Sequence, residues 1–176
     1  MTLSGGQKQR LFIALALIND PEVVFLDELT TGLDPQARRA IWELVRGIRD
    51  RGKTVFMTTH LMEEAERLCD RVAIMEHGEI IDIGTPEELV RRHCPERTVV
   101  LATDRAVAEE QLRMMASVAK VTRQDAQFTV QGTGENFVTD VIQCLSENRI
   151  RVTDFRTVLP SLEDVFLKLT GHSIRD

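Results

Sequence analysis

Residues 23–28 read Val23-Val24-Phe25-Leu26-Asp27-Glu28, four apolar residues followed at once by two carboxylates. A short apolar run between turn signals is typical of a strand buried on both faces of a parallel sheet. Ligands of such sheets bind at the carboxyl ends of the strands, where Asp27 and Glu28 lie. Adjacent carboxylates there suit Mg²⁺ and a water molecule to be activated. The stretch predicts an α/β fold with a candidate metal and catalytic site at the end of the strand.

The residues on either side of this strand predict two helices and a second strand. Upstream, apolar residues are so dense in residues 7–19 that we expect a mostly buried helix. Downstream, Asp34 and Pro35 can start a helix with one apolar face, made of Ile41, Leu44, Val45 and Ile48. Residues 54–59 are β-branched and apolar, and they predict a second buried strand that ends at His60. This alternation indicates crossover connections in an α/β layer.

The next segments predict smaller elements. Residues 62–69 return to a helical pattern. His77-Gly78 predicts the tight turn of a hairpin between residues 71–75 and 79–83. Thr85-Pro86-Glu87-Glu88 predicts the start of another short helix.

A change in composition around residues 93–97 predicts a linker, and hence domains of residues 1–93 and 97–176. After the linker we expect strand, helix, strand, strand, helix and strand, in that order, at residues 98–102, 105–115, 118–123, 127–131, 136–147 and 151–156. This is the order of a small ferredoxin-like α+β domain. A last helix is expected after Pro160, with Ser161 and Asp164 as its capping box and Gly171 as its end.

Composition and charge exclude several functions. The chain of 176 residues has a net charge of -6, which gives no general reason to bind nucleic acid or an anionic membrane. The longest apolar run, residues 11–18, is far below the ~20 residues that span a bilayer, and the first residues do not resemble a signal peptide. The cysteines, Cys69, Cys94 and Cys144, are widely spaced and predict reduced thiols.

Ser4-Gly5-Gly6-Gln7 comes directly before the first predicted helix. A hydroxyl and two glycines there expose backbone N–H groups at the positive end of the helix dipole, an arrangement that binds phosphate. His60 follows Thr58-Thr59 at the end of the neighbouring strand, where its imidazole can reach a phosphate. Taken singly, these features have alternatives: a small-residue helix cap for residues 4–7 and a structural histidine for His60. For Asp27 and Glu28 the alternative is ordinary helix-capping acids after a strand.

Taken together and in order, these motifs resemble the second half of an ABC-type ATPase domain, over about residues 1–92. Leu3-Ser4-Gly5-Gly6-Gln7 matches the family signature, residues 23–27 resemble the Walker B strand, Thr31-Gly32-Leu33-Asp34 resembles the D-loop, and His60 matches the switch histidine. Two positions depart from the family pattern: Leu29 stands where proline is usual, and Thr31 where serine is common.

The resemblance implies ATP and Mg²⁺ as cofactors and a role for each matched residue. Asp27 holds Mg²⁺ through water, Glu28 polarises the attacking water, and His60 steadies the γ-phosphate. The remaining cofactor-binding residues are Ser4, Gly5, Gly6, Gln7 and Asp34. The signature contacts nucleotide that a second ATPase subunit holds in a head-to-tail dimer.

Residues 159–171, Leu-Pro-Ser-Leu-Glu-Asp-Val-Phe-Leu-Lys-Leu-Thr-Gly, resemble the C-terminal end of ATPases from drug-resistance and nodulation-factor exporters. This narrower resemblance implies an export subunit that works with a transmembrane permease. It implies a cytoplasmic location, peripheral on the inner face of the cell membrane and without insertion into it. The transported substrate and the permease stay open.

The resemblance also demands a Walker A loop, and only Gly47-Ile48-Arg49-Asp50-Arg51-Gly52-Lys53-Thr54 fits its pattern. A phosphate loop follows a strand and precedes a helix, whereas this stretch is predicted to follow a helix and precede a strand. We therefore expect a fragment without Walker A that neither binds ATP tightly nor hydrolyses it alone.

Two other readings remain. Residues 97–176 could serve as a non-catalytic regulatory or dimerisation module of an ABC complex. A lobe of an SMC-type DNA-maintenance ATPase is the third reading, and the acidic balance and the exporter-like tail argue against it.

Overall fold

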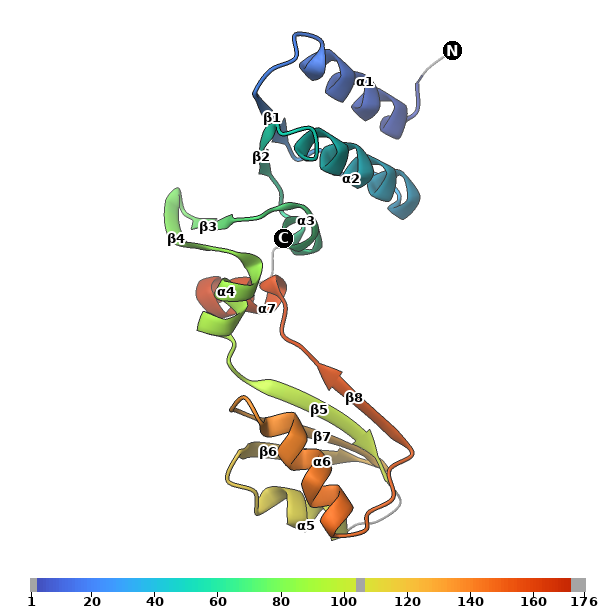
Figure 1. The fold of residues 1–176 in the computed structure, drawn as a ribbon, viewed down its shortest axis with the longest axis vertical. Coiled ribbons are helices and arrows are strands. Elements are labelled where there is room, and N and C mark those ends of the chain that lie inside the picture. Colours follow the sequence, from blue (N-terminus) through green and yellow to red (C-terminus); the bar gives the residue numbers. More distant parts are fainter. Residues whose placement is uncertain (1–2, 104–106, 172–176) are drawn as a thin grey trace. The chain divides into compact units, whose positions relative to one another are not determined.

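The computed structural model describes residues 3–103 and 107–171, which form two compact units. The chain divides between them after Pro86. Figure 1 labels the helices and strands in chain order. Unit 1 contains α1 (Gly5–Leu17), β1 (Val23–Asp27), α2 (Pro35–Arg49), β2 (Thr54–Thr58), α3 (Met62–Leu68), β3 (Val72–Glu76) and β4 (Glu79–Gly84). Unit 2 contains α4 (Pro86–His93), β5 (Arg97–Ala102), α5 (Val107–Arg113), β6 (Val118–Gln124), β7 (Gln127–Gly132), α6 (Phe137–Glu147), β8 (Asp154–Val158) and α7 (Leu162–Thr170).

In unit 1, β1 and β2 form a parallel pair joined by the crossover helix α2. The register runs from Val23 opposite Thr54 to Asp27 opposite Thr58, so both strands end at the same level. Parallel neighbours need such a crossover because a short turn cannot reverse the chain twice. The predicted strand–helix–strand order and the α/β class are confirmed for this unit.

The core of unit 1 lies on one face of this strand pair. Val24 and Leu26 of β1 are buried there with the apolar face of α2, which is formed by Ile41, Trp42, Val45 and Ile48. Ile13 is the buried residue of α1 in the same cluster. Leu44, expected on the apolar face, is 40% exposed, whereas Trp42 is buried.

The prediction of a mostly buried first helix is wrong. In α1 only one side reaches the core through Ile13, and apolar residues on its other sides are exposed: Leu11, Phe12, Leu15 and Ile18. The density of apolar residues does not say which neighbouring elements cover each side of the helix. Within the described residues, α2 is the helix that packs against α1, and one neighbour covers one side only.

The prediction that both strands are buried on both faces is wrong as well. Exposure alternates along β1, where Phe25 is 73% exposed, and Phe56 of β2 beside it is 59% exposed. The two rings lie 5.6 Å apart between centroids. Side chains alternate between the faces of a strand, so one face meets α2 while the other stays open. We call Phe25, Phe56 and Val23 the open face of unit 1.

The order of helix and strand around residues 47–54 rules out a phosphate loop. Helix α2 precedes it and β2 follows it. Gly52 has φ +81, a left-handed conformation that ends the helical region at little cost for glycine. The ammonium of Lys53 lies 2.7 Å from Oδ1 of Asp20 and is thus engaged in an ion pair.

The predicted hairpin is confirmed. Strands β3 and β4 pair antiparallel, with Glu76 opposite Glu79. The two turn residues both have positive φ, 50 for His77 and 82 for Gly78, as a type I′ turn requires.

Unit 2 is built around a four-stranded antiparallel sheet with the strand order β6-β7-β5-β8. Helices α5 and α6 contribute Ala108, Leu112, Phe137, Val141 and Leu145 to its core. Strands β5, β6 and β7 contribute Val99, Leu101, Val121, Phe128 and Val130. The predicted order of strands and helices is the observed one; the part of the predicted helix 105–115 that falls on residues 105 and 106 lies outside the described residues.

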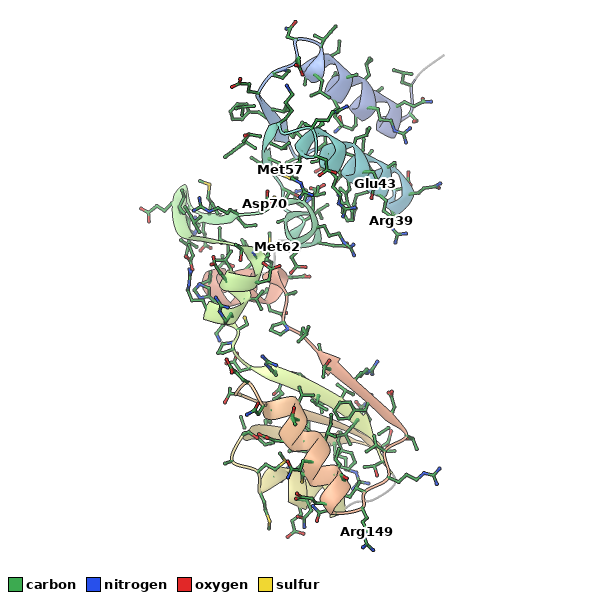
Figure 2. The ribbon with its side chains drawn as sticks, in the orientation of Figure 1. Arg39, Glu43, Met57, Met62, Asp70 and Arg149 are labelled. Atoms are coloured by element: carbon green, nitrogen blue, oxygen red, sulfur yellow. The ribbon has the colours of Figure 1, made fainter. Side chains whose placement is uncertain are left out.

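The last strand starts later than expected, at Asp154 rather than residue 151. Helix α6 ends in a Schellman motif in which the N–H of Ile150 donates to Leu145 O and that of Arg149 to Ser146 O. Arg149 takes the left-handed conformation there, at φ 51, and its side chain points into solvent (Figure 2). Ile150 is 7% exposed, so its apolar side chain packs as part of the helix end and not of a strand.

Unit 2 begins and ends in the sequence with a short helix, α4 and α7. α7 starts at the predicted capping box of Ser161 and Asp164 and ends at Gly171, whose φ is +77. Lys168 of α7 lies 3.4 Å from Glu96, just after α4. Leu89 of α4 is fully buried, and α4 belongs to unit 2, so the observed division precedes the segment predicted as a linker.

Candidate catalytic and nucleotide-binding site

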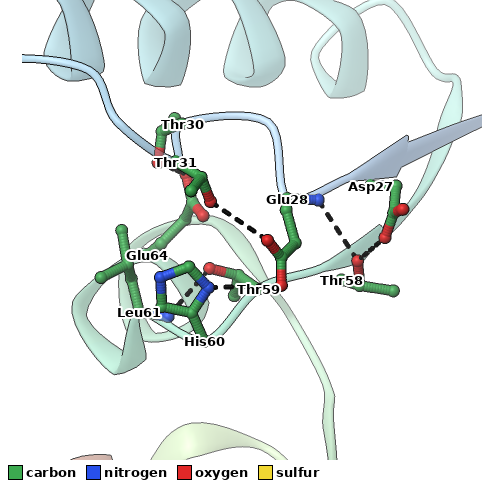
Figure 3. A network of polar contacts seen from close by, with 9 residues as sticks. All are labelled: Asp27, Glu28, Thr30, Thr31, Thr58, Thr59, His60, Leu61 and Glu64. Atoms are coloured by element: carbon green, nitrogen blue, oxygen red, sulfur yellow. Dashed lines mark hydrogen bonds and ion pairs between the residues drawn. The ribbon is translucent and has the colours of Figure 1, made fainter. Parts of the chain in front are cut away.

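The carboxyl ends of β1 and β2 bring Asp27 beside Thr58 (Figure 3). The Thr58 hydroxyl donates a hydrogen bond to Oδ1 of Asp27. The backbone N–H of Glu28 donates to Thr58 O at 3.1 Å and lies 3.3 Å from Thr58 Oγ1. Threonine is suited to this place because its hydroxyl can donate to one group while it accepts from another.

Glu28 and His60 meet just beyond the two strands. Nδ1 of His60 lies 3.4 Å from Oε1 of Glu28, and the Glu28 side chain is 53% exposed. The other oxygen, Oε2, accepts a hydrogen bond from the Thr31 hydroxyl at 3.3 Å. Glu28 has φ 42, an uncommon conformation for a residue with a side chain. Residues held in such uncommon backbone conformations are often found at functional sites.

The loop after Glu28 is held from two helices. Nε2 of Gln9 in α1 donates to Leu29 O at 2.7 Å. The Thr30 hydroxyl donates to Oε1 of Glu64 in α3 at 3.0 Å, and Nε1 of Trp42 donates to the same oxygen at 2.8 Å. The sequence interpretation missed Thr30 and Glu64 and assigned no contact to Trp42. The available signal was the place of Glu64 on the helix face that also carries Ala65 and Leu68, where a buried acid needs partners.

The signature residues form the start of α1. Ser4 is the N-cap, with the capping box closed by Gln7: Ser4 N–H donates to Gln7 Oε1 at 2.9 Å, and Gln7 N–H donates to Ser4 Oγ at 3.3 Å. The side chains thus satisfy two backbone donors of the helix end. Ser4, Gly5 and Gln7 are exposed, so this end of α1 is open to solvent.

The two glycines allow α1 to approach α2 closely. A Cβ on Gly5 would lie 3.4 Å from Leu33 Cδ2, and one on Gly6 would lie 3.3 Å from Ala37 Cβ. Asp34 is the N-cap of α2, where Oδ1 accepts from the N–H groups of Gln36 at 3.0 Å and Ala37 at 2.9 Å. The observed contacts of Asp34 are those of a helix cap.

The predicted site residues therefore fall into two sets. Asp27, Glu28 and His60 lie together, and Ser4, Gly5, Gly6 and Gln7 lie beside Asp34 at the adjacent starts of α1 and α2. In the part of the chain that the structure describes, no hydrogen bond or ion pair joins one set to the other. The connection between them is the loop of residues 28–34, which carries Glu28 at one end and Asp34 at the other.

The first set suits a magnesium ion better than a metal that needs an all-protein site. Asp27 and Glu28 offer exposed carboxylate oxygens, the ligand type that Mg²⁺ prefers. Over residues 3–103 and 107–171, no group of three or more histidine, cysteine or acidic residues could by itself hold a metal. Mg²⁺ fits because it keeps water molecules and takes one or two carboxylates together with substrate phosphates.

None of the helices in the described ranges has the length and apolar character to cross a bilayer. The longest of them, α2, has 15 residues and carries several charged side chains.

Two family models match the chain. The family described as "AAA domain, putative AbiEii toxin, Type IV TA system" matches residues 2–66, and the family "ATP-binding protein DrrA1-3-like, C-terminal domain" matches residues 84–170. The first covers both sets of site residues, and the second covers most of unit 2.

Similar proteins match over nearly the whole chain. The Nod factor export ATP-binding protein I of Bradyrhizobium diazoefficiens is 42% identical over 178 residues, covering 98% of this chain and 54% of that protein. The proteins of the same name from Rhizobium meliloti and Burkholderia lata are each 41% identical over 99% of this chain, covering 50% and 55% of their own lengths. The chain thus spans about half the length of these relatives. These matches and the ordered motifs show that the chain belongs to the ATP-binding proteins of ABC transporters.

Proposed function

We propose that the chain supplies the signature, catalytic carboxylate and switch histidine of an ATP-hydrolysing subunit in an export system. The observation that carries the proposal is the contact between Glu28 Oε1 and His60 Nδ1 at 3.4 Å, formed where two parallel strands end. A vestigial site has no physical need for this pair of titratable groups at a strand edge.

In this proposal Asp27 would hold Mg²⁺ with its exposed carboxylate. When bound, Mg²⁺ supplies positive charge that stabilises the phosphate oxygens. Glu28 accepts a hydrogen bond from the attacking water and orients it, and Thr31 holds Glu28 from its other oxygen. His60 donates to the γ-phosphate. Orientation and charge stabilisation provide most of the rate in phosphoryl transfer.

The start of α1 takes the second role, the recognition of phosphate on a nucleotide held by another ATPase subunit in a head-to-tail dimer. Its support is a helix of 13 residues with a solvent-open N-terminus at Ser4, Gly5 and Gly6. Gln7 caps this end, and Asp34 keeps the D-loop attached to α2 beside it. In a dimer of subunits that each have a Walker A loop, each signature would then face the nucleotide held by the other subunit.

We propose a ferredoxin-like accessory domain for unit 2. Its support is the βαββαβ order of β5 to β8 and the antiparallel strand order β6-β7-β5-β8, with α5 and α6 in the same core. The other partner is a transmembrane permease, with the protein cytoplasmic and peripheral on the inner face of the membrane. Support comes from the export role in the names of the similar proteins.

A chimeric protein tests the proposal. The 176 residues replace the matching segment of the Bradyrhizobium diazoefficiens relative, and ATP hydrolysis is measured with Mg²⁺. We expect hydrolysis by the chimera and a loss of about 10²-fold or more in kcat with Glu28→Gln. The 176 residues alone are expected to show no micromolar binding of labelled ATP. A folded chimera whose Glu28→Gln variant hydrolyses ATP at the full rate would contradict the proposal and favour the regulatory role.

A further inference from the structure

Glu64 is a buried acid outside the residues with a proposed contact to nucleotide. It lies in α3, its residue is 1% exposed, and Thr30 beside it is fully buried. Oε1 accepts from both Thr30 Oγ1 and Trp42 Nε1, at 3.0 and 2.8 Å, while Oε2 is buried and has no hydrogen-bond partner. Among the described residues no cation pairs with it.

The hydrogen bonds of Glu64 offset the cost of its burial only in part. Taking a carboxyl group out of water costs free energy, and one of its oxygens recovers none of it through a hydrogen bond. Replacing a whole buried polar network by apolar side chains is often neutral for stability, whereas removing the acceptor alone leaves the Thr30 and Trp42 donors unpaired. What Glu64 provides and an apolar residue does not is an acceptor that fixes the Thr30 hydroxyl.

Fixing Thr30 fixes the geometry of Glu28. Thr30 lies two residues after Glu28 and directly before Thr31. Thr31 makes two contacts back to Glu28: its N–H donates to Glu28 O at 3.2 Å and its hydroxyl to Oε2 at 3.3 Å. Leu33 N–H then donates to Thr30 O at 3.1 Å. Thr30 is thus the anchored residue in the middle of the turn that orients the Glu28 carboxylate.

In Figure 3 the Glu64 side chain extends toward Thr30, and Thr31 faces Glu28. On these contacts we propose that Glu64 is a positioning residue that holds the Glu28 carboxylate in its orientation through Thr30 and Thr31. The functional consequence rests on the proposed function, in which Glu28 orients the attacking water. A displacement of about 1 Å at a catalytic group can cost about 10²-fold in rate.

Hydrogen exchange in the 176-residue chain tests the positioning. Glu64→Leu keeps an apolar side chain of similar size and removes the acceptor, and Thr30→Val removes the donor alone. Both variants are expected to speed exchange of the amides of Thr31 and Leu33 about tenfold, through local opening of the turn. Unit 2 serves as the internal reference and keeps its protection.

Two matched variants separate positioning from mere packing. Glu64→Gln keeps an oxygen that can accept both hydrogen bonds, so it is expected to restore the exchange rates of the unaltered chain. Glu63→Gln, at the exposed neighbour that pairs with Arg67, is expected to leave them unchanged. Trp42 is the single tryptophan of the chain, and its fluorescence is expected to shift in Glu64→Leu and to stay in Glu64→Gln and Glu63→Gln.

The chimera supplies the kinetic reading. Glu64→Leu is expected to lower kcat about tenfold or more with a nearly unchanged KM for ATP, and Glu64→Gln to stay within about twofold. The proposal is overturned if Thr30→Val and a folded Glu64→Leu leave the exchange of Thr31 and Leu33 unchanged. Failure of the proposed function is a different result: Glu28→Gln keeps full hydrolysis, whatever the exchange rates show.

Discussion

Nδ1 of His60 lies 3.4 Å from Oε1 of Glu28, although the two residues belong to different strand ends and are separated by a helix in the sequence. The contact depends on the register of β1 and β2, because Asp27 is opposite Thr58. Glu28 directly follows Asp27, and His60 lies two positions after Thr58. Two groups proposed to act at one reacting phosphate need rigid supporting elements, and a paired strand end provides that.

Replacement of His60 tests its share in this pair. His60→Ala in the chimera removes a group proposed to stabilise charge on the γ-phosphate, so kcat is expected to fall about 10²- to 10³-fold, as measured by phosphate release. The matched control is His77→Asn, in an exposed turn where asparagine tolerates the left-handed backbone. Equal rates for His60→Ala and the control would contradict the assigned role.

Gly132 ends β7 where no side chain fits. A Cβ there would overlap with Ser117 O and with the ring of Phe137, so Gly132→Ala is expected to lower the free energy of unfolding by about 1–3 kcal/mol. Gly47→Ala is the matched control: it lies in α2 with open space around its Cβ and is expected to stabilise by up to about 1 kcal/mol. Denaturant titration followed by circular dichroism measures both. Unchanged stability of Gly132→Ala would show that the contact relaxes freely.

The open face of unit 1 predicts self-association of the isolated chain. Phe25 and Phe56 are 73% and 59% exposed, and adjoining exposed apolar side chains favour contact with other molecules. Light scattering after gel filtration is expected to show species larger than a monomer. The double variant Phe25→Thr with Phe56→Thr is expected to reduce them.

A buried neighbour supplies the control for this prediction. Val24 is 2% exposed, and Val24→Thr is expected to lower the free energy of unfolding by about 1–3 kcal/mol. It is not expected to reduce self-association. A monodisperse monomer of the unaltered chain at high concentration would contradict the predicted self-association through the open face.

The Asp20–Lys53 pair predicts a pH dependence. A side-chain hydrogen bond from Lys53, together with its charge, holds the pKa of Asp20 below the ordinary value of 3.8. A folded-state pKa below the unfolded one stabilises the fold above the unfolded pKa, and this contribution is lost as the pH falls through the folded pKa. Lys53→Met is therefore expected to lower the denaturant midpoint at pH 7 and to differ little from the unaltered chain at about pH 2.

The control for this comparison is Lys120→Met in β6, which is expected to leave the midpoint nearly unchanged at both pH values. A Lys53→Met effect of equal size at both pH values would assign it to the packing of the lysine stem and not to its pairing with Asp20.

Local sequence patterns predicted most helices and strands, and they predicted that Asp27, Glu28 and His60 lie together at the strand ends. The apolar runs before Asp27 and His60 indicated neighbouring parallel strands, and the carboxyl ends of such strands necessarily lie together. The left-handed dipeptide His77-Gly78 and the capping box of Ser161 are equally local signals, and the structure has both where they were expected.

What the sequence did not predict depends on contacts between distant segments. Apolar density in α1 measures how much surface favours burial, but it does not say which element covers each side, so Phe12 and Leu15 were misjudged. β8 starts late because Ile150 belongs to the end of α6, where its N–H donates to Leu145 O. An alternation of apolar and polar residues does not reveal such a backbone hydrogen bond. The bonds of Glu64 join residues 22 and 34 positions apart, beyond the reach of helix or strand periodicity.

The crossover between β1 and β2 also bears on how the chain reaches its fold. Asp27 and Thr58 are 31 positions apart, and the chain must close this loop before the pair gains any ladder bond. In unit 2, by contrast, Gln124 pairs with Gln127 across a turn of two residues. Because local contacts form sooner than distant ones, we expect the β6–β7 hairpin to be an early folding event. Pairing of β1 with β2, which brings Asp27, Glu28 and His60 together, is expected to be a late one.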